Sequence, residues 1–305
     1  MAKAVEVDEM EKYGDFLKKG TFCLIETHAW GNTKKIPEDK LKKITKNKEL
    51  SKWVRANKGL IDKEALEDIN SNIGRFRNLF KSRALPSPFT SIYVIPNDDI
   101  MEVSEEADIL IKNVDKSVKK FAPKYTEYIE AAKEELGPNL FNPDDYPKNI
   151  ESRFSCSYRF VKLSVPGELK TISAAMYKEE MIKFKETMEQ TRNECILFLR
   201  EAFLKELKSI IESLTREADD GKVAKIRSET VEKVENFFEA FKSKNIFEDE
   251  KLLQIIEDAR NVMCGVTSKD LRNSDALRSL ITNQIKQVAD ICEKSIVKYK
   301  RKISF

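Results

Sequence analysis

The sequence is poor in the residues from which metal sites are built. Its 305 residues include one histidine, His28, and five cysteines that are scattered along the chain without a CxxC pair. Common zinc sites use four closely spaced cysteine or histidine ligands, so we predict no structural metal and a His28 that is structural or simply exposed. An odd, dispersed set of cysteines is typical of reduced thiols rather than of a disulfide framework.

Long apolar segments are also missing. No run approaches the roughly 18 residues that a membrane-spanning helix needs. The first twenty residues are charged throughout, unlike the apolar core of a signal peptide. We therefore expect no membrane association and a cytoplasmic location.

Catalytic motifs are absent as well. The sequence contains no GxxxxGK loop, no GxSxG and no HExxH, which are the motifs of common nucleotide-binding and hydrolytic sites. Acidic pairs such as Asp98-Asp99 and Asp144-Asp145 fall in expected turns and helix starts, where carboxylates stabilise the helix dipole. We predict a protein without catalytic residues and without a cofactor; an enzyme with a dispersed site is the least favoured interpretation.

The most regular feature is the stretch 171–216, which contains neither glycine nor proline. It predicts one helix of roughly 65 Å, capped at its start by Thr171 or Ser173. An apolar seam with alternating four- and three-residue spacing, typical of a coiled coil, runs through it. The seam residues that we single out for packing or assembly are Met181, Phe184, Met188, Phe198 and Leu214.

Two interpretations of this seam remain open. It is either the core stripe of a single molecule, which is the favoured interpretation, or an intermolecular stalk. We expect Phe184 to lie in the core, whereas for residues near the helix tip, such as Leu214, contact with another surface is allowed.

Three segments have the composition or the period-two alternation of strands. They cover residues 21–30, 89–95 and 151–166. Between them the apolar spacing predicts a helix at 62–80 and a long helix at 98–136, which Pro123 should kink or interrupt. We expect an α+β protein, mostly α, in which 98–136 and 171–216 form a long antiparallel hairpin or coiled coil with a small antiparallel β section at one end.

These elements suggest three sections along the chain. A basic N-terminal α+β section covers residues 1–97, and a long-helix hairpin with an intervening strand at 151–166 covers 98–216. A C-terminal helical subdomain, 217–305, contains helices expected at about 222–243, 249–263 and 274–300.

Charge is unevenly distributed, although the whole chain carries only +3. Residues 34–83 contain fifteen lysines and arginines against seven acids, whereas 97–137 contains six against eleven. Basic surfaces of this kind follow phosphate backbones, and Trp30 and Trp53 could offer stacking platforms. The candidate contacts for nucleic acid or an acidic partner are Lys34, Lys35, Lys42, Lys43, Arg75 and Arg77; a merely solvated surface is the alternative.

Three segments together resemble a known family. They are GTFCLIETHAWGNTKKI (20–36), the segment 85–96 that ends in IYVIP, and RFSCSYRFVKLSVP (153–166). The likeness, over roughly residues 15–215, is to an uncharacterised prokaryotic family of phages, plasmids and other mobile elements, often encoded near MoxR-type AAA+ ATPases and von Willebrand A-domain proteins. The resemblance implies an accessory or structural component of such a system and supplies no catalytic residues.

The first functional hypothesis is therefore a non-enzymatic interaction or assembly protein. It would act as a homo-oligomer or with a protein partner, for which the resemblance suggests an AAA+ ATPase. The second is a nucleic-acid-binding accessory protein that uses the basic region 34–83.

Overall fold

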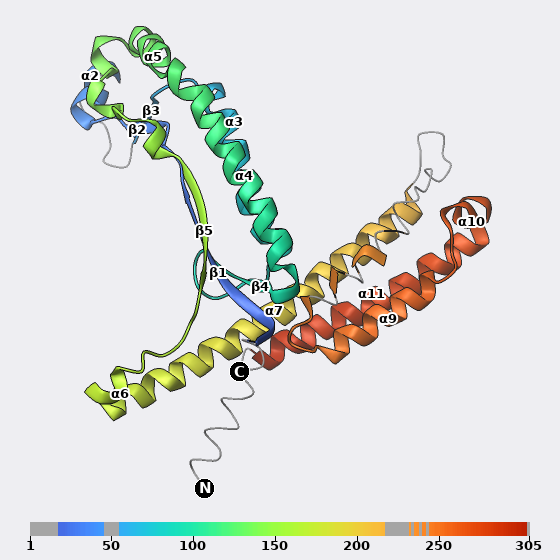
Figure 1. Cartoon of the computed structure of the whole chain (residues 1–305). Coiled ribbons are helices and arrows are strands. Elements are labelled where there is room, and N and C mark those ends of the chain that lie inside the picture. The colour runs from blue at the N-terminus through green and yellow to red at the C-terminus, as the bar shows by residue number, and fades with distance from the viewer. Residues whose placement is uncertain are drawn as a thin grey trace. The chain divides into compact units, whose positions relative to one another are not determined.

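The computed structural model describes residues 18–45, 55–216 and 244–303, together with Glu232, 235–237 and 240–241 (Figure 1). The chain forms two compact units, each assembled from separate segments. We call Cys23–Arg83 with Met101–Phe160 the pocket unit, and Met1–Phe22, Ala84–Ile100 and Val161–Phe305 the bundle unit. The mostly helical α+β fold expected from the sequence is confirmed.

A small antiparallel sheet contains the three expected strands. Its order is β4 (Ile92–Pro96), β1 (Gly20–His28), β5 (Ser155–Val161), so β1 is the central strand. The period-two pattern places Phe154, just before β5, and Cys156 within it in the core, but Phe160, which the same alternation puts on that face, is exposed. A second sheet, which the sequence did not suggest, pairs β2 (Thr33–Lys35) with β3 (Asn57–Gly59) in antiparallel register.

The helices of the pocket unit follow the apolar spacing of the sequence. In α3 (Glu67–Arg83), preceded by the short η1 (Glu64–Leu66), the regularly spaced apolar residues Ile69, Ile73, Phe76 and Phe80 are all buried. The remaining elements of this unit are α2 (Glu38–Thr45), α4 (Ile100–Phe121), η3 (Ala122–Lys124), α5 (Tyr125–Leu140), η4 (Pro143–Asp145) and η5 (Glu151–Arg153).

Pro123 interrupts the long helix as expected. The helical path passes through the short 3-10 segment η3 between α4 and α5, because proline cannot donate the backbone hydrogen bond that an α-helix requires at this point. Gly137 ends the regular part of α5 with a φ of +60°, a left-handed value that glycine adopts without strain.

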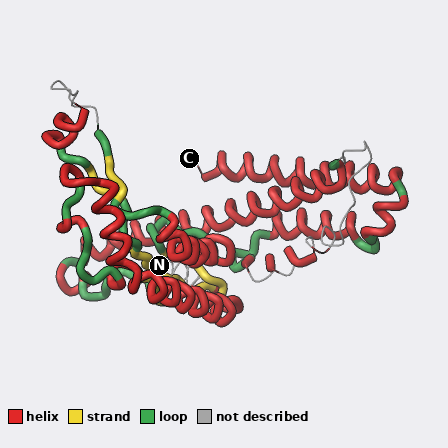
Figure 2. Tube along the Cα trace, turned by 90° about the horizontal axis from the view of Figure 1, so that it is seen from above, coloured by secondary structure: helices red, strands yellow, loops and turns green. Residues whose placement is uncertain are grey.

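The bundle unit is dominated by α7 (Ala174–Thr215), capped by the side chain of Ser173, which accepts a hydrogen bond from the amide of Met176. It also contains η2 (Asn97–Asp99), α6 (Leu169–Ile172), α9 (Glu250–Met263), α10 (Ser268–Asn273) and α11 (Asp275–Ile303). The helices α7, α9 and α11 run alongside one another (Figures 1 and 2). Their core is a continuous apolar cluster that includes Leu199, Phe203, Leu207, Ile256 and Ile285.

The main helix pair differs from the expected one. Within the bundle unit the antiparallel partner of α7 is α11: Tyr299 donates to Asn193, and Lys208 donates to Glu293. The expected pairing of 98–136 with 171–216 is not the one that builds either unit, because α4 and α5 belong to the pocket unit. The two units also differ from the three consecutive sections proposed at 1–97, 98–216 and 217–305.

The helices expected at 249–263 and 274–300 correspond to α9 and α11. Most of the helix expected at 222–243 lies outside the described residues. In the part of the chain that the structure describes, no helix has the length and apolar character needed to cross a membrane.

A buried ion pair joins three helical segments of the bundle. Arg200 of α7 donates through Nε and Nη2 to both carboxylate oxygens of Asp249, each at 2.8 Å, and through Nη1 to the carbonyl of Ser295 at 3.2 Å. Its guanidinium lies 4.7 Å from the ring centre of Tyr299. Asp249 also caps α9, so one carboxylate organises both the helix start and the packing.

We expect Arg200→Leu to lower the free energy of unfolding by about 3–5 kcal/mol, because it leaves the Asp249 carboxylate buried without its partner. Urea denaturation followed by circular dichroism measures the loss. The matched control is Lys208→Leu on the same helix, which removes the exposed pair with Glu293 and should cost less than about 1 kcal/mol. Equal losses in the two variants would contradict the role assigned to the buried pair.

Candidate functional sites: the Trp30 pocket and the α7 arm

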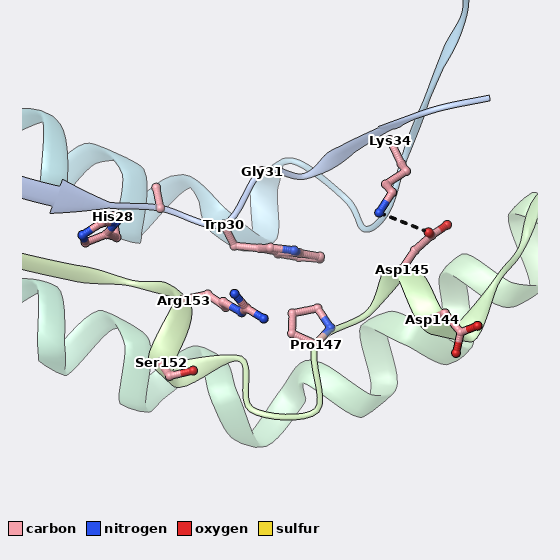
Figure 3. A pocket seen from close by; sticks show the side chains of 10 residues that line it. His28, Trp30, Gly31, Lys34, Asp144, Asp145, Pro147, Ser152 and Arg153 are labelled. Atoms are coloured by element: carbon pink, nitrogen blue, oxygen red, sulfur yellow. Dashed lines mark ion pairs between the residues drawn. The ribbon is translucent and has the colours of Figure 1, made fainter. Parts of the chain in front are cut away.

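A depression of about 470 Å³ lies where β1 ends in the pocket unit. It is bordered by the chain just after β1 and by the segment that leads into β5 (Figure 3). Its lining residues are His28, Ala29, Trp30, Gly31, Lys34, Asp144, Asp145, Pro147, Ser152 and Arg153. We call it the Trp30 pocket.

Trp30 is the only aromatic residue that lines this pocket. Its indole is half-buried and meets the ring of Tyr125 edge-on, with the ring centres 5.8 Å apart. Tyr125 in turn packs against Phe121. Figure 3 shows Arg153 and Pro147 across the pocket from the indole. Because its ring is supported on one side and accessible on another, Trp30 presents a fixed apolar surface to a ligand.

Tyr125 has an unusual environment. Among the described residues, its hydroxyl is the buried side-chain polar atom that lacks a hydrogen-bond partner. Burial, assisted by the nearby Tyr146, raises the pKa of Tyr125 to about 12. Unsatisfied buried polar groups lower stability and are uncommon in folded proteins. The packing around Tyr125 is therefore not optimised for stability alone.

Asp145 is fixed by a nearly buried ion pair. Lys58 of β3 lies 2.6 Å from the Asp145 carboxylate, and both side chains are at most 10% exposed. Lys58 also donates to the carbonyl of Leu140, while the exposed Lys34 lies 3.6 Å from the same carboxylate. Asp145 is therefore neutralised within the protein and adds little negative charge to the pocket.

Three further hydrogen bonds hold the turn after β1 and the loop before β5 to Leu60 and Ile61, the two residues that follow β3. The Asn32 side chain donates to the Ile61 carbonyl at 2.7 Å and accepts from the Ile61 amide at 2.9 Å. The Tyr146 hydroxyl donates to the Leu60 carbonyl at 2.8 Å. The pocket walls are thus connected through β3 rather than left as independent loops.

A second, smaller depression of about 120 Å³ adjoins the first, since Lys34 and Asp145 line both. Its other polar residues are Lys35, Lys40, Lys58 and Asn142. We call it the lysine depression. Together the two depressions are lined by five lysines and arginines against two carboxylates.

The structure brings together only part of the predicted basic surface. Lys34 and Lys35 are exposed on β2 and share the lysine depression, and Lys42 is exposed on α2. Arg75 is exposed on α3, whereas Arg77 is engaged with the Thr27 hydroxyl through Nε and Nη2. The side chain of Lys43 and the whole of Trp53 lie outside the described residues.

The α7 arm is the other candidate surface. We define it as residues 174–187, in which no side chain is buried, whereas ten are buried between Met188 and Leu214. The arm and the preceding α6 nevertheless carry large apolar residues: Ile172 is 73% exposed, Met176 51% and Ile182 49%.

The predicted seam residues separate into two groups. Met188 and Leu214 are buried in the bundle core, and Phe198 packs partly buried against it. Met181 is half-buried, and Phe184 is only partly buried against the core. Leu214, at the tip where the sequence allows contact with another surface, is buried because α7 pairs with α11 toward that end. Among the described residues, it is the N-terminal end of α7 that has no fully buried side chain.

Cysteine and histidine form no metal centre in the described part of the chain, where no group of three or more His, Cys, Asp or Glu is placed to hold an ion. His28 is exposed at the pocket edge. Four cysteines are buried and Cys264 is exposed. Burial raises the pKa of Cys23 to about 12 and those of Cys156 and Cys292 to about 11, and it also raises the pKa of Cys195.

Comparison with known proteins adds no relative: no family model, curated protein or solved structure matches this chain. The resemblance to a mobile-element family therefore stays a prediction.

We expect Lys58→Met to lower the free energy of unfolding by about 3 kcal/mol, because Asp145 loses its nearest cation inside the protein. Thermal or urea denaturation measures this. Lys34→Met removes the exposed cation beside the same carboxylate and should cost less than about 1 kcal/mol. If Lys34→Met proves the more damaging change, the assignment of Lys58 as the anchor fails.

A thiol-reactive dye at pH 8 should label one cysteine of the folded protein rapidly, because the thiolate is the reacting species and only Cys264 is exposed. In denaturant the other four cysteines should be labelled as well. Rapid labelling that persists in Cys264→Ser would contradict the burial of the other four.

Proposed function

We propose that the protein is a non-enzymatic assembly protein that self-associates through the α7 arm. One observation carries this proposal: the coiled-coil spacing of the seam continues through residues 174–187, where no side chain is fully buried and only Phe184 packs partly against the bundle core. Isolated apolar residues on a surface are ordinary, but the partly exposed seam residues Tyr177 and Met181 share one face of the arm, and an apolar helix face that is left partly exposed is a candidate interaction site.

Helix lengths support the same conclusion. The 42 residues of α7 extend about 63 Å and the 29 residues of α11 about 44 Å. Roughly 20 Å of α7 therefore has no equivalent on its antiparallel partner. That excess matches the length of the arm.

The charge of the arm favours a second copy of this chain as the occupant. Residues 174–187 contain three lysines and three glutamates. Two such neutral arms do not repel each other electrostatically, whereas an arm of one charge would select an oppositely charged partner. Seam residues spaced by four and three are the pattern through which helices pair in coiled coils.

The wider setting rests on the sequence resemblance. We propose an accessory or structural role in a phage, mobile-element or AAA+ ATPase-linked system, with the assembled arms as the scaffold. A cytoplasmic location is part of this proposal, in keeping with five free thiols.

The test compares two methionines one heptad apart on the seam. We expect Met181→Asp to leave the protein folded by circular dichroism but to reduce its mass in light scattering to that of a monomer. Met188→Asp should instead destabilise the fold by several kcal/mol, because it places a charge in the core. A wild-type protein that is monomeric at high concentration, or a Met181→Asp variant that still assembles, would refute the proposal.

A further inference from the structure

We propose that the Trp30 pocket and the lysine depression form a binding site for single-stranded nucleic acid. One base lies against the Trp30 indole, and the adjoining phosphates contact Arg153, Lys34 and Lys35. The site is contained in the pocket unit and does not depend on self-association through the α7 arm.

The Trp30 indole supplies the sequence-tolerant part of the contact. Bases stack on aromatic side chains through their π-faces, and every base has such a face. The ring is held by its edge contact with Tyr125, so it is ordered before a ligand arrives. The pocket volume of about 470 Å³ lies within the range of small-ligand sites, which is room for one nucleotide rather than a helix.

Positively charged side chains supply the second part of the contact, the attraction of phosphates. Arg153 and Lys34 flank the indole, and Lys35 and Lys40 continue the basic lining through the lysine depression. Asp145, at the junction of the two, is already compensated by Lys58 at 2.6 Å. Asp144 is the other carboxylate of the lining, so phosphates following this path would meet a surface in which cations outnumber anions. This resembles the combination of stacking platform and basic groove that single-strand-binding proteins use.

Because the indole lies within a depression, we expect the site to bind a single strand and not a duplex. Bases in a double helix are stacked on their neighbours and cannot insert a face into a pocket, whereas unpaired bases can. A free mononucleotide shares the base and phosphate chemistry but cannot occupy both depressions. Length dependence therefore distinguishes a strand from a small nucleotide.

The first measurement uses tryptophan fluorescence. The chain has two tryptophans, so Trp53→Phe leaves Trp30 as the only one. We expect a short oligothymidine to quench this fluorescence at low salt, with an affinity that falls as salt rises because counterions are released. The oligonucleotide should bind at least about tenfold more tightly than a duplex of equal length, which cannot make the base–aromatic contact. It should also bind more tightly than thymidine monophosphate, which lacks the further phosphates that reach the lysine depression.

Variants locate the contacts by anisotropy of a labelled oligonucleotide. Trp30→Ala should weaken binding at least about tenfold, and Trp30→Phe, which retains an aromatic face, should restore most of the affinity. Arg153→Glu should weaken binding and reduce the salt slope by roughly 0.7 for each lost phosphate contact. The matched control is Lys116→Glu, an exposed charge reversal on α4, which should change neither quantity.

Several results would overturn the proposal. They are no quenching at low salt, equal affinity for the oligonucleotide and either the monophosphate or the duplex, and an equal loss of affinity in Lys116→Glu and Arg153→Glu. Circular dichroism of each variant distinguishes a lost contact from a lost fold.

Discussion

The unequal lengths of α7 and α11 are the constraint on which the bundle unit depends. A helix can bury its apolar face only where another element runs beside it, and α11 is 13 residues shorter than α7. The fold covers the C-terminal part of α7, around Leu207 and Leu214, and pins it with the Arg200–Asp249 pair. Within the described part of the bundle unit, residues 174–187 are therefore left without a fully buried side chain. The same seam is thus core over one part of its length and surface over the other.

In the pocket unit the corresponding constraint is the nearly buried ion pair between Lys58 and Asp145. Placing Lys58 and Asp145 away from water carries a desolvation cost that their mutual contact offsets. In return, the loop before β5 is fixed to β3, and Asp145, one of the two carboxylates of this loop that line the pocket, no longer opposes the neighbouring cations. Arg153, Lys34 and Lys35 then dominate the local field beside Trp30. The lysine-rich surface predicted from the sequence thus contains a defined pocket with a positive local potential.

The elements set by local periodicity could be predicted: the three strands of the main sheet, the buried stripe of α3, and the break at Pro123. Features that depend on contacts between residues far apart in the sequence could not be predicted. Strands of three residues are too short to show a period, so the β2–β3 pair was missed, and Lys58 looked like one more solvated lysine because Asp145 lies far along the chain. Trp30 was predicted as a stacking platform, but its neighbour Arg153 was not singled out. The antiparallel pairing of β1 with β5 places the residues just after one strand beside those just before the other, but the strand order was not known. The partner of α7 also had to await the structure, because the seams of α4 and α11 are similar in pattern.

The two surfaces respond to solution conditions in opposite ways, which makes them separable in one preparation. Added salt weakens contacts between lysines and phosphates through counterion competition but does not weaken burial of the seam residue Met181, and salting-out anions strengthen it. An assembly held by the α7 arm should therefore persist at salt concentrations that empty the Trp30 pocket. If assembly and nucleic-acid binding instead disappeared together as salt increased, a single ionic contact would have to explain both, and the neutral arm, with its three lysines and three glutamates, could not provide it.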